Sequence, residues 1–396
     1  MKIIYPYPAY WPYMRRGAER CIHDITNYLA RRGHDVDIVT SKPGRSRVSY
    51  DGAVRVVYLK QLSHPLSYKY TPLMRLYMFG AQATTQMVRG NYDVAHLWSY
   101  SAILAAPVLR RWLNVPYLFH MILRTHHWPG RVDRWLFQQL LEHANTVAAL
   151  TPRGAAEVTE AYGVPAISLS PAVDMDVFRP LVPTDTQRPR VLFTGDLGDP
   201  RKGGPLLLRA WNEIHRRCPE AVLVLAGPFG LGFDFGFDVY TLERLDLIRS
   251  SLARDAVEIP GAGALADLPY QYSRASVSVL PSVDEAFGMV VTESLACGTP
   301  VVCSSYGGPG EIVTSPDVGV TVPLKTHADL VSERAARELA DAVLAGIELS
   351  RQQGIEQRCR AWAESWSLDR VGAATEALLM EIAESSRRGV PRRSVA

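Results

Sequence analysis

The chain has 396 residues, of which 47% are hydrophobic and 21% charged, and its formal net charge is +3. This length exceeds the roughly 250 to 300 residues that one hydrophobic core supports, so we expect two domains, and the ordinary composition excludes a largely disordered chain. No apolar run approaches the roughly 18 to 20 residues that span a bilayer, and the N-terminal MKIIYPYP turns polar too early for a signal peptide.

The net charge hides a difference between the two halves of the sequence. Residues 1–180 contain 21 Lys and Arg against 12 Asp and Glu, a balance of +9, whereas the remainder contains 22 against 28, a balance of −6. A basic first half predicts an anionic ligand, such as a phosphate, or an acidic membrane surface. Uneven charge on an otherwise ordinary surface is the alternative.

The cysteines are scattered along the sequence without the C-x-x-C spacing of zinc sites or redox motifs. We therefore expect buried free thiols in a reducing cytosol rather than a disulfide framework. The five residues are Cys21, Cys218, Cys297, Cys303 and Cys359.

The first half of the chain alternates predicted strands and helices. This spacing is typical of a doubly wound parallel sheet, whose ligands bind outside the carboxyl ends of the strands, where His120 lies. A lone histidine is also common as a hydrogen-bonded structural group. The predicted strands are Met1–Tyr5, Asp35–Thr40, Asp93–Leu97, Pro116–His120 and Asn145–Leu150, and the predicted helices are Gly17–Arg32, Ala102–Leu113, Arg131–His143 and Pro152–Tyr162.

A proline- and threonine-rich linker, Leu181–Pro189, precedes the second half. There a strand, Arg190–Thr194, leads into GDLGDPRKGG, which contains Lys202 and comes directly before a predicted helix, Pro205–Arg217. Backbone N–H groups at the start of a helix, with a cation beside them, predict an anion-binding site. Further strands are predicted at Ala221–Gly227 and Val257–Ile259.

Each of these two strands is followed by a glycine-containing loop. The loop at 228–240 is rich in Gly and Phe and is a candidate lid or base-stacking loop, with a plain surface loop as the alternative. Residues 261–266 match G-x-G-x-x-A, which alone is a weak indication of dinucleotide binding.

The stretch from Val277 to Glu311 carries most of the predicted chemistry. It contains a strand, a loop, a helix, a second strand and a glycine loop, which together form half of a nucleotide-binding α/β layer. Glu285 lies on the first loop and Glu293 on the helix, with seven residues between them. The predicted elements are the strand Val277–Leu280, the helix Met289–Ala296, the strand Val301–Cys303 and the loop Gly307–Gly308. Further on, a helix is predicted at Glu333–Leu349 and one or two more over Trp362–Ser385.

Flanked by Pro-Ser, Phe-Gly, ACGTPVV and GGPGEI, this pair of glutamates resembles the donor-site signature of glycosyltransferase family 4. RGAER and LARRGHDVDIVT resemble the opening unit of that family, and VPYLFH resembles its strand that ends in a histidine. The resemblance implies the GT-B fold, with two Rossmann-like doubly wound parallel-sheet domains facing a cleft. The implied parts are an acceptor-binding domain (1–180), a nucleotide-sugar-binding domain (188–365), a C-terminal helix packing back on the first domain (366–386) and a basic tail that we expect to be disordered (387–396).

The resemblance also implies a reaction: a retaining glycosyltransferase moves a sugar from a nucleotide diphosphate donor to an acceptor hydroxyl. Lys202 would neutralise the leaving diphosphate, Glu285 would fix donor hydroxyls, and His120 would orient the reacting sugar or acceptor. Glu293 would bind the ribose diol. The other implied donor-binding residues are Gly17, Asp196, Arg201, Gly203, Phe287, Gly288 and Met289, and the implied acceptor-binding residues are Arg16, His120 and His126.

The sequence departs from the family pattern at two places. Where the family has two glycines after the first strand, this chain has Arg16-Gly17 behind an unusual aromatic insert. Where the family has an arginine before the diphosphate lysine, this chain has Asp196. A carboxylate there repels a diphosphate unless it pairs with Arg201, binds a cation or faces the sugar. We expect Asp196 to serve the native donor.

Other functions stay open at this point. A GT-B epimerase or phosphorylase shares the architecture, Asp196 favours a sugar-nucleotide-binding protein without catalysis, and 261–266 alone supports a nicotinamide oxidoreductase. For the transferase we expect no cofactor and no metal requirement. The expected partners are a nucleotide sugar and a glycan, lipid-linked or small-molecule acceptor, without nucleic acid. The expected location is the cytoplasm, with peripheral contact to an anionic membrane as an open alternative.

Overall fold

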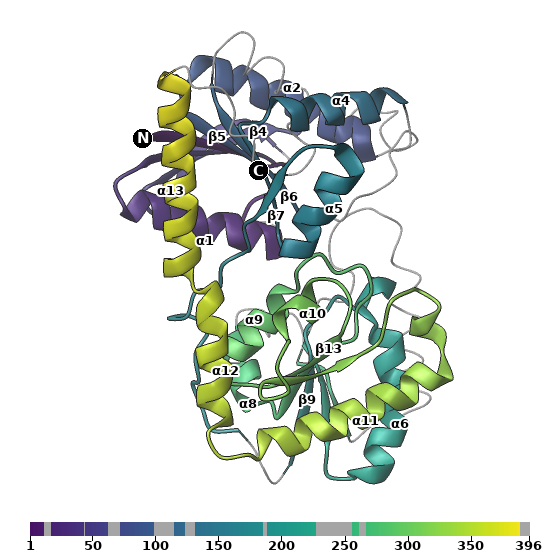
Figure 1. Ribbon diagram of the computed structural model, residues 1–396. Coiled ribbons are helices and arrows are strands. Elements are labelled where there is room, and N and C mark those ends of the chain that lie inside the picture. Colours follow the sequence, from purple (N-terminus) through teal and green to yellow (C-terminus); the bar gives the residue numbers. More distant parts are fainter. Residues whose placement is uncertain are drawn as a thin grey trace. The chain divides into compact units, whose positions relative to one another are not determined.

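The computed structural model describes residues 1–11, 17–42, 44–61, 72–98, 115–122, 131–184, 188–226, 256–260 and 267–388. The chain divides into two compact units (Figure 1). Unit 1 consists of Met1–Ala172 and Leu368–Ala396, and unit 2 of Val173–Ser367. Each unit contains one twisted sheet with α-helices packed on it, as the alternating elements of the sequence predict.

The sheet of unit 1 has eight strands in the order β3-β4-β2-β1-β5-β6-β7-β8. Its pairings are parallel except that of β3 with β4, which is antiparallel. The strand order reverses between β1 and β5, which makes this pair the topological switch point of unit 1. The strands are β1 Lys2–Pro6, β2 Asp35–Lys42, β3 Arg47–Asp51, β4 Val54–Lys60, β5 Val94–Trp98, β6 Tyr117–Met121, β7 Thr146–Ala149 and β8 Ala166–Ser168.

Apolar residues of α2, α4 and α5 form one core with the strands of unit 1, and α1 packs against α13. The contact between α1 and α13 is close, because a Cβ on Gly372 would lie 2.7 Å from the ring of Tyr28. Glu376 of α13 also accepts from Arg32 at 3.2 Å and pairs with His34 at 2.8 Å. The C-terminal helix therefore belongs to unit 1. The helices are α1 Gly17–Arg31, α2 Pro72–Arg89, α4 Arg131–His143, α5 Pro152–Tyr162 and α13 Leu368–Arg387.

The sheet of unit 2 has six parallel strands in the order β11-β10-β9-β12-β13-β14. Its order reverses between β9 and β12, the switch point of unit 2. Helices α6 and α11 pack over the central strands, with Trp211 fully buried among them. The strands are β9 Arg190–Phe193, β10 Val222–Leu225, β11 Val257–Glu258, β12 Val277–Leu280, β13 Val301–Ser304 and β14 Gly319–Val322, and the helices are α6 Gly204–Arg217, α8 Leu268–Arg274, α9 Met289–Ala296, α10 Gly308–Ile312, α11 Glu333–Ser350 and α12 Ile355–Ala363.

Side-chain caps explain several helix boundaries that the sequence already predicts. Thr151 accepts from the N–H of Gly154 at the start of α5, and Ser332 accepts from the N–H of Ala335 at the start of α11. Gly163 ends α5 with φ at 65°, a left-handed conformation that suits glycine.

The structure contains elements that the sequence pattern does not predict, notably β3, β4, α2, β8, α8 and β14. Strand β3 lies at the sheet edge and is largely exposed, so its residues lack a continuous apolar pattern. Of the one or two helices predicted over 362–385, α13 covers the stretch from Leu368 onward, whereas α12 ends at Ala363 and lies mostly before the predicted start. The predicted helix at 102–113 and the loops at 228–240 and 261–266 lie outside the described residues.

All five cysteines are buried and free, as predicted for the thiols themselves. Burial raises the pKa of the Cys21 and Cys359 thiols to about 12, so both are protonated at neutral pH. Within the described ranges, no helix combines the length and the apolar character needed to cross a membrane.

Candidate functional site

Three loops meet at the carboxyl edge of the unit 2 sheet: residues 194–203, 281–288 and 305–308, which we call the switch-point loops. They follow β9, β12 and β13, which are neighbours in the sheet. The N–H of Val283 donates to the carbonyl of Arg201 at 2.9 Å, and the N–H of Gly308 donates to the carbonyl of Glu285 at 3.0 Å. Backbone contacts therefore join the three loops at the sheet edge where open α/β sheets bind ligands.

Two glycines allow these loops to approach so closely. Gly203 has φ at +74°, and a Cβ there would lie 2.0 Å from the carbonyl oxygen of Pro281. Gly307 also has φ at +74°, and its Cβ would lie 2.6 Å from the carbonyl oxygen of Glu285. No residue with a side chain fits either position without moving a backbone segment.

Lys202 and Glu285 form an ion pair between two of these loops, from the Lys202 Nζ to the Glu285 Oε2. Their side chains are 27% and 18% exposed, so both are partly desolvated but still reach solvent. The fold thus brings together two residues that are 83 positions apart and that the sequence analysis selected separately. A partly buried ammonium group is well suited to bind phosphate oxygens.

The residue before Glu285 has an unusual backbone conformation. Asp284 has φ at 54°, and its Oδ2 lies 3.3 Å from the Nε2 of His327. Residues other than glycine seldom adopt positive φ, and such conformations gather at ligand-binding and catalytic sites.

Helix α9 begins in the same loop. Its N-cap residue, Gly288, has φ at 97° and provides no side-chain cap, and the preceding Phe287 is buried. The N–H groups at the start of a helix carry a partial positive charge and bind anions. Phe287, Gly288 and Met289 therefore supply a second source of positive potential beside Lys202.

Glu293 lies inside α9 and is only 4% exposed. The hydroxyl of Tyr272 donates to its Oε2 at 3.1 Å, and the Tyr272 oxygen lies 3.1 Å from the Oγ1 of Thr194. Because the single hydroxyl proton of Tyr272 goes to Glu293, Thr194 must donate to Tyr272. Burial, followed by the charge of Glu293, raises the pKa of Tyr272 well above its usual value. Sequence reasoning missed Tyr272 and Thr194, since neither belongs to the motif.

Asp196 has a local structural role in the first loop. Its Oδ1 accepts from the N–H of Gly198 at 2.8 Å. The guanidinium of Arg201 binds Asp199 through two contacts, at 3.1 and 2.7 Å. Burial alone would raise the pKa of Asp199, but Arg201 outweighs it and lowers this pKa. Of the options that the sequence left open for Asp196, one was a pairing with Arg201, and the guanidinium of Arg201 engages Asp199.

In unit 1, His120 lies within β6 and is 1% exposed. Its Nε2 is 2.9 Å from the carbonyl of Leu169 and its Nδ1 is 3.3 Å from the Nε2 of His96, whose Nδ1 is 3.0 Å from the hydroxyl of Tyr5. A carbonyl only accepts, so His120 is protonated on Nε2, and the bonds then run from Tyr5 through His96 and His120 to Leu169.

Both histidines of this chain of hydrogen bonds are neutral. Burial lowers the pKa of His120 to about 4 and that of His96 well below its usual value. The prediction that His120 ends its strand is wrong, because Met121 follows it in β6. Both ring nitrogens of His120 already have protein partners, so a contact with a sugar would require one of these bonds to break.

Of the predicted site residues in the first half of the chain, Gly17 lies within the described residues, whereas Arg16 and His126 do not. Gly17 is the first residue of α1, after the loop that follows β1. Arg16, His126 and the adjacent His127 lie outside the described residues, as does the tail from residue 389 onward. Among the residues that the structure describes, no group of three or more His, Cys, Asp or Glu side chains is arranged to hold a metal ion.

Comparison with known families gives two matches that follow each other along the chain. Residues 16–170 match the glycosyl transferase 4-like domain, and residues 174–354 match the glycosyl transferases group 1. The second match contains all three switch-point loops. The chain belongs to the family 4 glycosyltransferases.

Individual relatives agree with this family assignment, because they are glycosyltransferases too. A D-inositol 3-phosphate glycosyltransferase of Corynebacterium diphtheriae is 27% identical over 354 residues, covering 81% of this chain and 80% of the relative. One from Kineococcus radiotolerans is 34% identical over 188 residues, covering 43% of this chain and 42% of the relative. The matched part spans about half the length of several such relatives, between 42% and 57%.

Solved structures establish the fold of the glycosyltransferase. The sucrose-phosphate synthase of Thermosynechococcus elongatus is 20% identical, with a TM-score of 0.79 over 97% of this chain and 99% of that chain. Anabaena HepE, solved in complex with UDP and glucose, is 19% identical, with a TM-score of 0.71 over 96% and 99%. The predicted GT-B fold is therefore confirmed.

Proposed function

We propose that this glycosyltransferase moves a sugar from a nucleoside diphosphate donor to an acceptor hydroxyl with retention of the anomeric configuration. The observation that carries the proposal is the Lys202–Glu285 pair at the switch point of unit 2, beside the start of α9. The solved complex of a structural neighbour with UDP and glucose supports the donor class.

In the proposed reaction, the bond between sugar C1 and the phosphate oxygen breaks, and a bond between C1 and the acceptor oxygen forms on the same face. The acceptor proton moves to the leaving phosphate oxygen. Negative charge therefore grows on the diphosphate, where Lys202 and the N–H groups of Gly288 and Met289 stabilise it. Glu285 accepts hydrogen bonds from sugar hydroxyls and fixes the orientation of C1.

The remaining donor contacts follow when the diphosphate of the donor lies beside Lys202 and the start of α9. Glu293 accepts from the ribose diol while Tyr272 holds its carboxylate in place. Gly17 and Gly203 allow the backbone to approach the phosphates. Asp196 takes part in recognition of the native donor, and Arg201 acts through its contact with Asp199.

We assign acceptor recognition to unit 1, with His120 as a part of its scaffold. The names of the relatives, which include D-inositol 3-phosphate glycosyltransferases and a sucrose-phosphate synthase, support an acceptor that is a polyol or sugar carrying a phosphate. The balance of +9 in residues 1–180 supports an anionic acceptor as well. Five buried free thiols support a reducing, cytoplasmic location. Peripheral contact with an anionic membrane is tested by sedimentation with phosphatidylserine vesicles.

The experiment is a thermal-shift screen of nucleotide sugars, followed by mass spectrometry of products with phosphorylated and unphosphorylated polyols. The anomeric coupling constant of the product, measured by NMR, tests retention. Lys202→Ala should lower the rate of transfer by about 10²- to 10³-fold, whereas Arg334→Ala, which breaks an exposed ion pair with Glu338 on α11, should not change it. Near-normal transfer in Lys202→Ala would place the donor elsewhere.

A second candidate function is a sugar-nucleotide-binding protein without catalysis, which Asp196 favours because a carboxylate near the phosphates opposes charge build-up. Such a protein would bind the donor in the thermal-shift screen. It would not transfer the sugar to any acceptor, and it would not hydrolyse the donor even slowly. A single turnover to any acceptor eliminates this candidate.

A further inference from the structure

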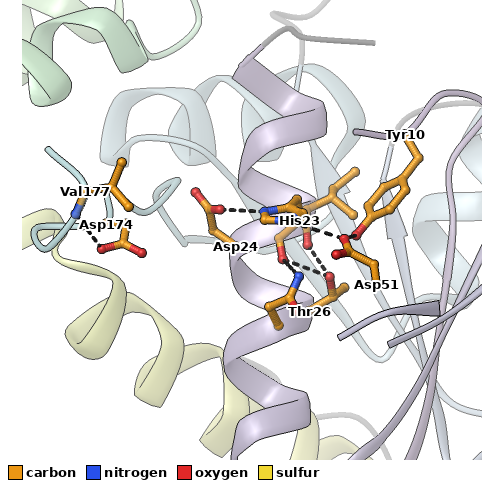
Figure 2. A network of polar contacts seen from close by, with 9 residues as sticks. Tyr10, His23, Asp24, Thr26, Asp51, Asp174 and Val177 are labelled. Carbon is orange, nitrogen blue, oxygen red and sulfur yellow. Dashed lines mark hydrogen bonds and ion pairs between the residues drawn. The ribbon is translucent and has the colours of Figure 1, made fainter. Parts of the chain in front are cut away.

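A group of polar side chains in unit 1 connects the loop after β1 to helix α1 and strand β3 (Figure 2). Its members are Tyr10 on the loop, His23 and Asp24 on α1, and Asp51 at the end of β3. This loop contains the aromatic insert that distinguishes the sequence from its family, and it leaves β1 at the switch point of unit 1. We call the group the His23 clamp.

His23 contacts a carboxylate with each ring nitrogen. Its Nδ1 lies 2.8 Å from the Oδ1 of Asp24, and its Nε2 lies 3.3 Å from the Oδ2 of Asp51. Ionised carboxylates only accept hydrogen bonds, so both contacts are favourable only when both nitrogens carry a proton. A neutral ring would turn a lone pair toward one of the two carboxylates, and the geometry therefore selects the imidazolium.

The direction of the pKa shift of His23 agrees with this geometry. Burial alone would lower the pKa of His23, but the hydrogen bond to Asp24 and the charges of Asp24 and Asp51 outweigh burial and raise it. Arg20, one turn earlier on α1, opposes the positive charge. The protonated form thus persists to a higher pH than for an ordinary histidine.

The clamp reaches the aromatic insert through two neighbouring residues. The hydroxyl of Tyr10 donates to the Oδ2 of Asp51 at 2.8 Å, the same oxygen that faces His23, and Tyr10 is 2% exposed. The ring of Trp11 lies 6.1 Å from the ring of His23, and the guanidinium of Arg20 lies 5.1 Å from the Trp11 ring. The imidazolium therefore fixes Asp51, and Asp51 fixes Tyr10.

The start of the loop is fixed independently of the clamp. The N–H of Tyr7 donates to the carbonyl of Val39 at 2.9 Å, and the hydroxyl of Ser41 donates to the carbonyl of Pro8 at 2.8 Å. Within the described part of the loop, the contribution of the clamp is thus confined to Tyr10 and Trp11.

We infer that protonated His23 is a positioning residue for sugar transfer: it holds Tyr10 and Trp11, in the loop after β1, in the conformation that receives the acceptor. The inference rests on the proposed function, in which unit 1 recognises the acceptor. Loss of the proton would release Asp51 and with it Tyr10, so acceptor binding would weaken while donor binding and the chemical step would stay the same.

Other titratable groups around the clamp have to be separated from His23. Tyr58 of β4 and Arg47 of β3 interact electrostatically near Asp51, and Thr26 of α1 hydrogen-bonds Tyr10. Burial and the hydrogen bond to Asp51 raise the pKa of Tyr10 far beyond the neutral range. A change between pH 6 and 8.5 therefore reports on His23 rather than on these phenols or on Arg47.

The first test compares the acceptor KM of the full-length enzyme with that of His23→Gln between pH 6 and 8.5. For the wild type, KM should rise about three- to tenfold as pH passes the pKa of His23, whereas His23→Gln should have the higher KM throughout and a flat profile. Donor KM and kcat should change by less than about twofold in both. His143→Gln, a substitution on α4 of the same unit, is the matched control and should keep the wild-type profile. An unchanged KM profile in His23→Gln would overturn the inference.

The second test needs no activity. NMR of the His23 ring in the full-length protein should show protons on both nitrogens at pH 7 and titration above about pH 6.5. In Asp51→Asn, which keeps an acceptor for Tyr10 but removes the charge, the His23 pKa should fall. A neutral ring at pH 7 would overturn the clamp even if the protein transfers sugar. If no transfer is found with any donor, the proposed function fails, and this titration alone decides whether the clamp exists.

Discussion

Units 1 and 2 have the same kind of switch point but place opposite chemistry at it. In unit 2, partly exposed charges lie on the loops that follow β9 and β12, where Lys202 pairs with Glu285. In unit 1, the strands β1, β5 and β6 contribute Tyr5, His96 and His120, which are buried and uncharged. The strands beside the switch point of unit 1 thus form a neutral scaffold, and the charges of His23, Asp24 and Asp51 lie outside these strands.

The difference follows from the cost of desolvation. Burial of an imidazolium without a carboxylate partner costs much free energy. The rings of His96 and His120 are therefore neutral and share a hydrogen bond. Lys202, by contrast, forms an ion pair with Glu285, and solvent still reaches both groups. Under the proposed function, charge that responds to a diphosphate therefore resides in unit 2, while acceptor recognition in unit 1 depends on loops, such as the one that contains Tyr10.

The largest expected effect comes from removing the charged pair of unit 2. Lys202→Ala and Glu285→Ala should each lower kcat by about 10²- to 10³-fold, because both act on groups whose charge or geometry changes in the transition state. Steady-state kinetics with saturating donor measure this, and Arg334→Ala serves as the control. Near-normal turnover in either variant would show that the charged pair of unit 2 is not needed for catalysis. The proposed contrast between unit 2 and the neutral network of unit 1 would then be wrong.

The neutral network of unit 1 predicts acid sensitivity. The pKa of His120 is about 4 in the folded protein and should be near 6.5 in the unfolded chain, so its contribution to stability is present above pH 6.5 and is lost as pH falls toward 4. The loss should amount to on the order of 3 kcal/mol for this group. Urea unfolding of the unit 1 transition at pH 7 and pH 4.5 measures it.

His120→Gln should reduce that pH dependence, since glutamine does not titrate. His96 would still contribute in the same direction, because burial lowers its pKa as well. His143→Gln is the control. Equal losses of stability for the wild type and His120→Gln would mean that the buried ring is already charged or that acid unfolding starts elsewhere.

The sequence predicts much of unit 2 because its site is made of short local patterns. The β12 and α9 boundaries, Lys202 with Gly203, and the pair of glutamates all follow from residues close together in the chain. What fails are contacts between distant segments. The hydrogen bond of Tyr272 to Glu293 and the burial of His120 against Leu169 depend on how elements pack, which no local pattern predicts.

Glu293 offers a finer test of the charged site. Glu293→Gln keeps the size of the side chain but replaces a charged acceptor, so donor affinity should fall by about tenfold, with kcat nearly unchanged, because ribose contacts change little along the reaction. Tyr272→Phe should give a smaller loss, since it removes only the group that holds the carboxylate. Isothermal titration with the nucleoside diphosphate measures both. Unchanged affinity together with a collapsed kcat would contradict the ribose assignment.

The smallest effect is expected from Asp196→Asn, which separates the charge of Asp196 from its structural role. An asparagine oxygen can still accept from the N–H of Gly198, so the loop should keep its conformation and the melting temperature should not change. If Asp196 serves the native donor, Asp196→Asn should lower turnover by about three- to tenfold, a loss of roughly 1 kcal/mol. Asp196→Arg removes this cap as well and should abolish turnover, even though its cation could attract a diphosphate. Titration of the nucleoside diphosphate and turnover assays on both variants decide between the two roles. Tighter binding with retained turnover in Asp196→Arg would show that the carboxylate is dispensable and that the charged edge of unit 2 works as a plain cationic phosphate site.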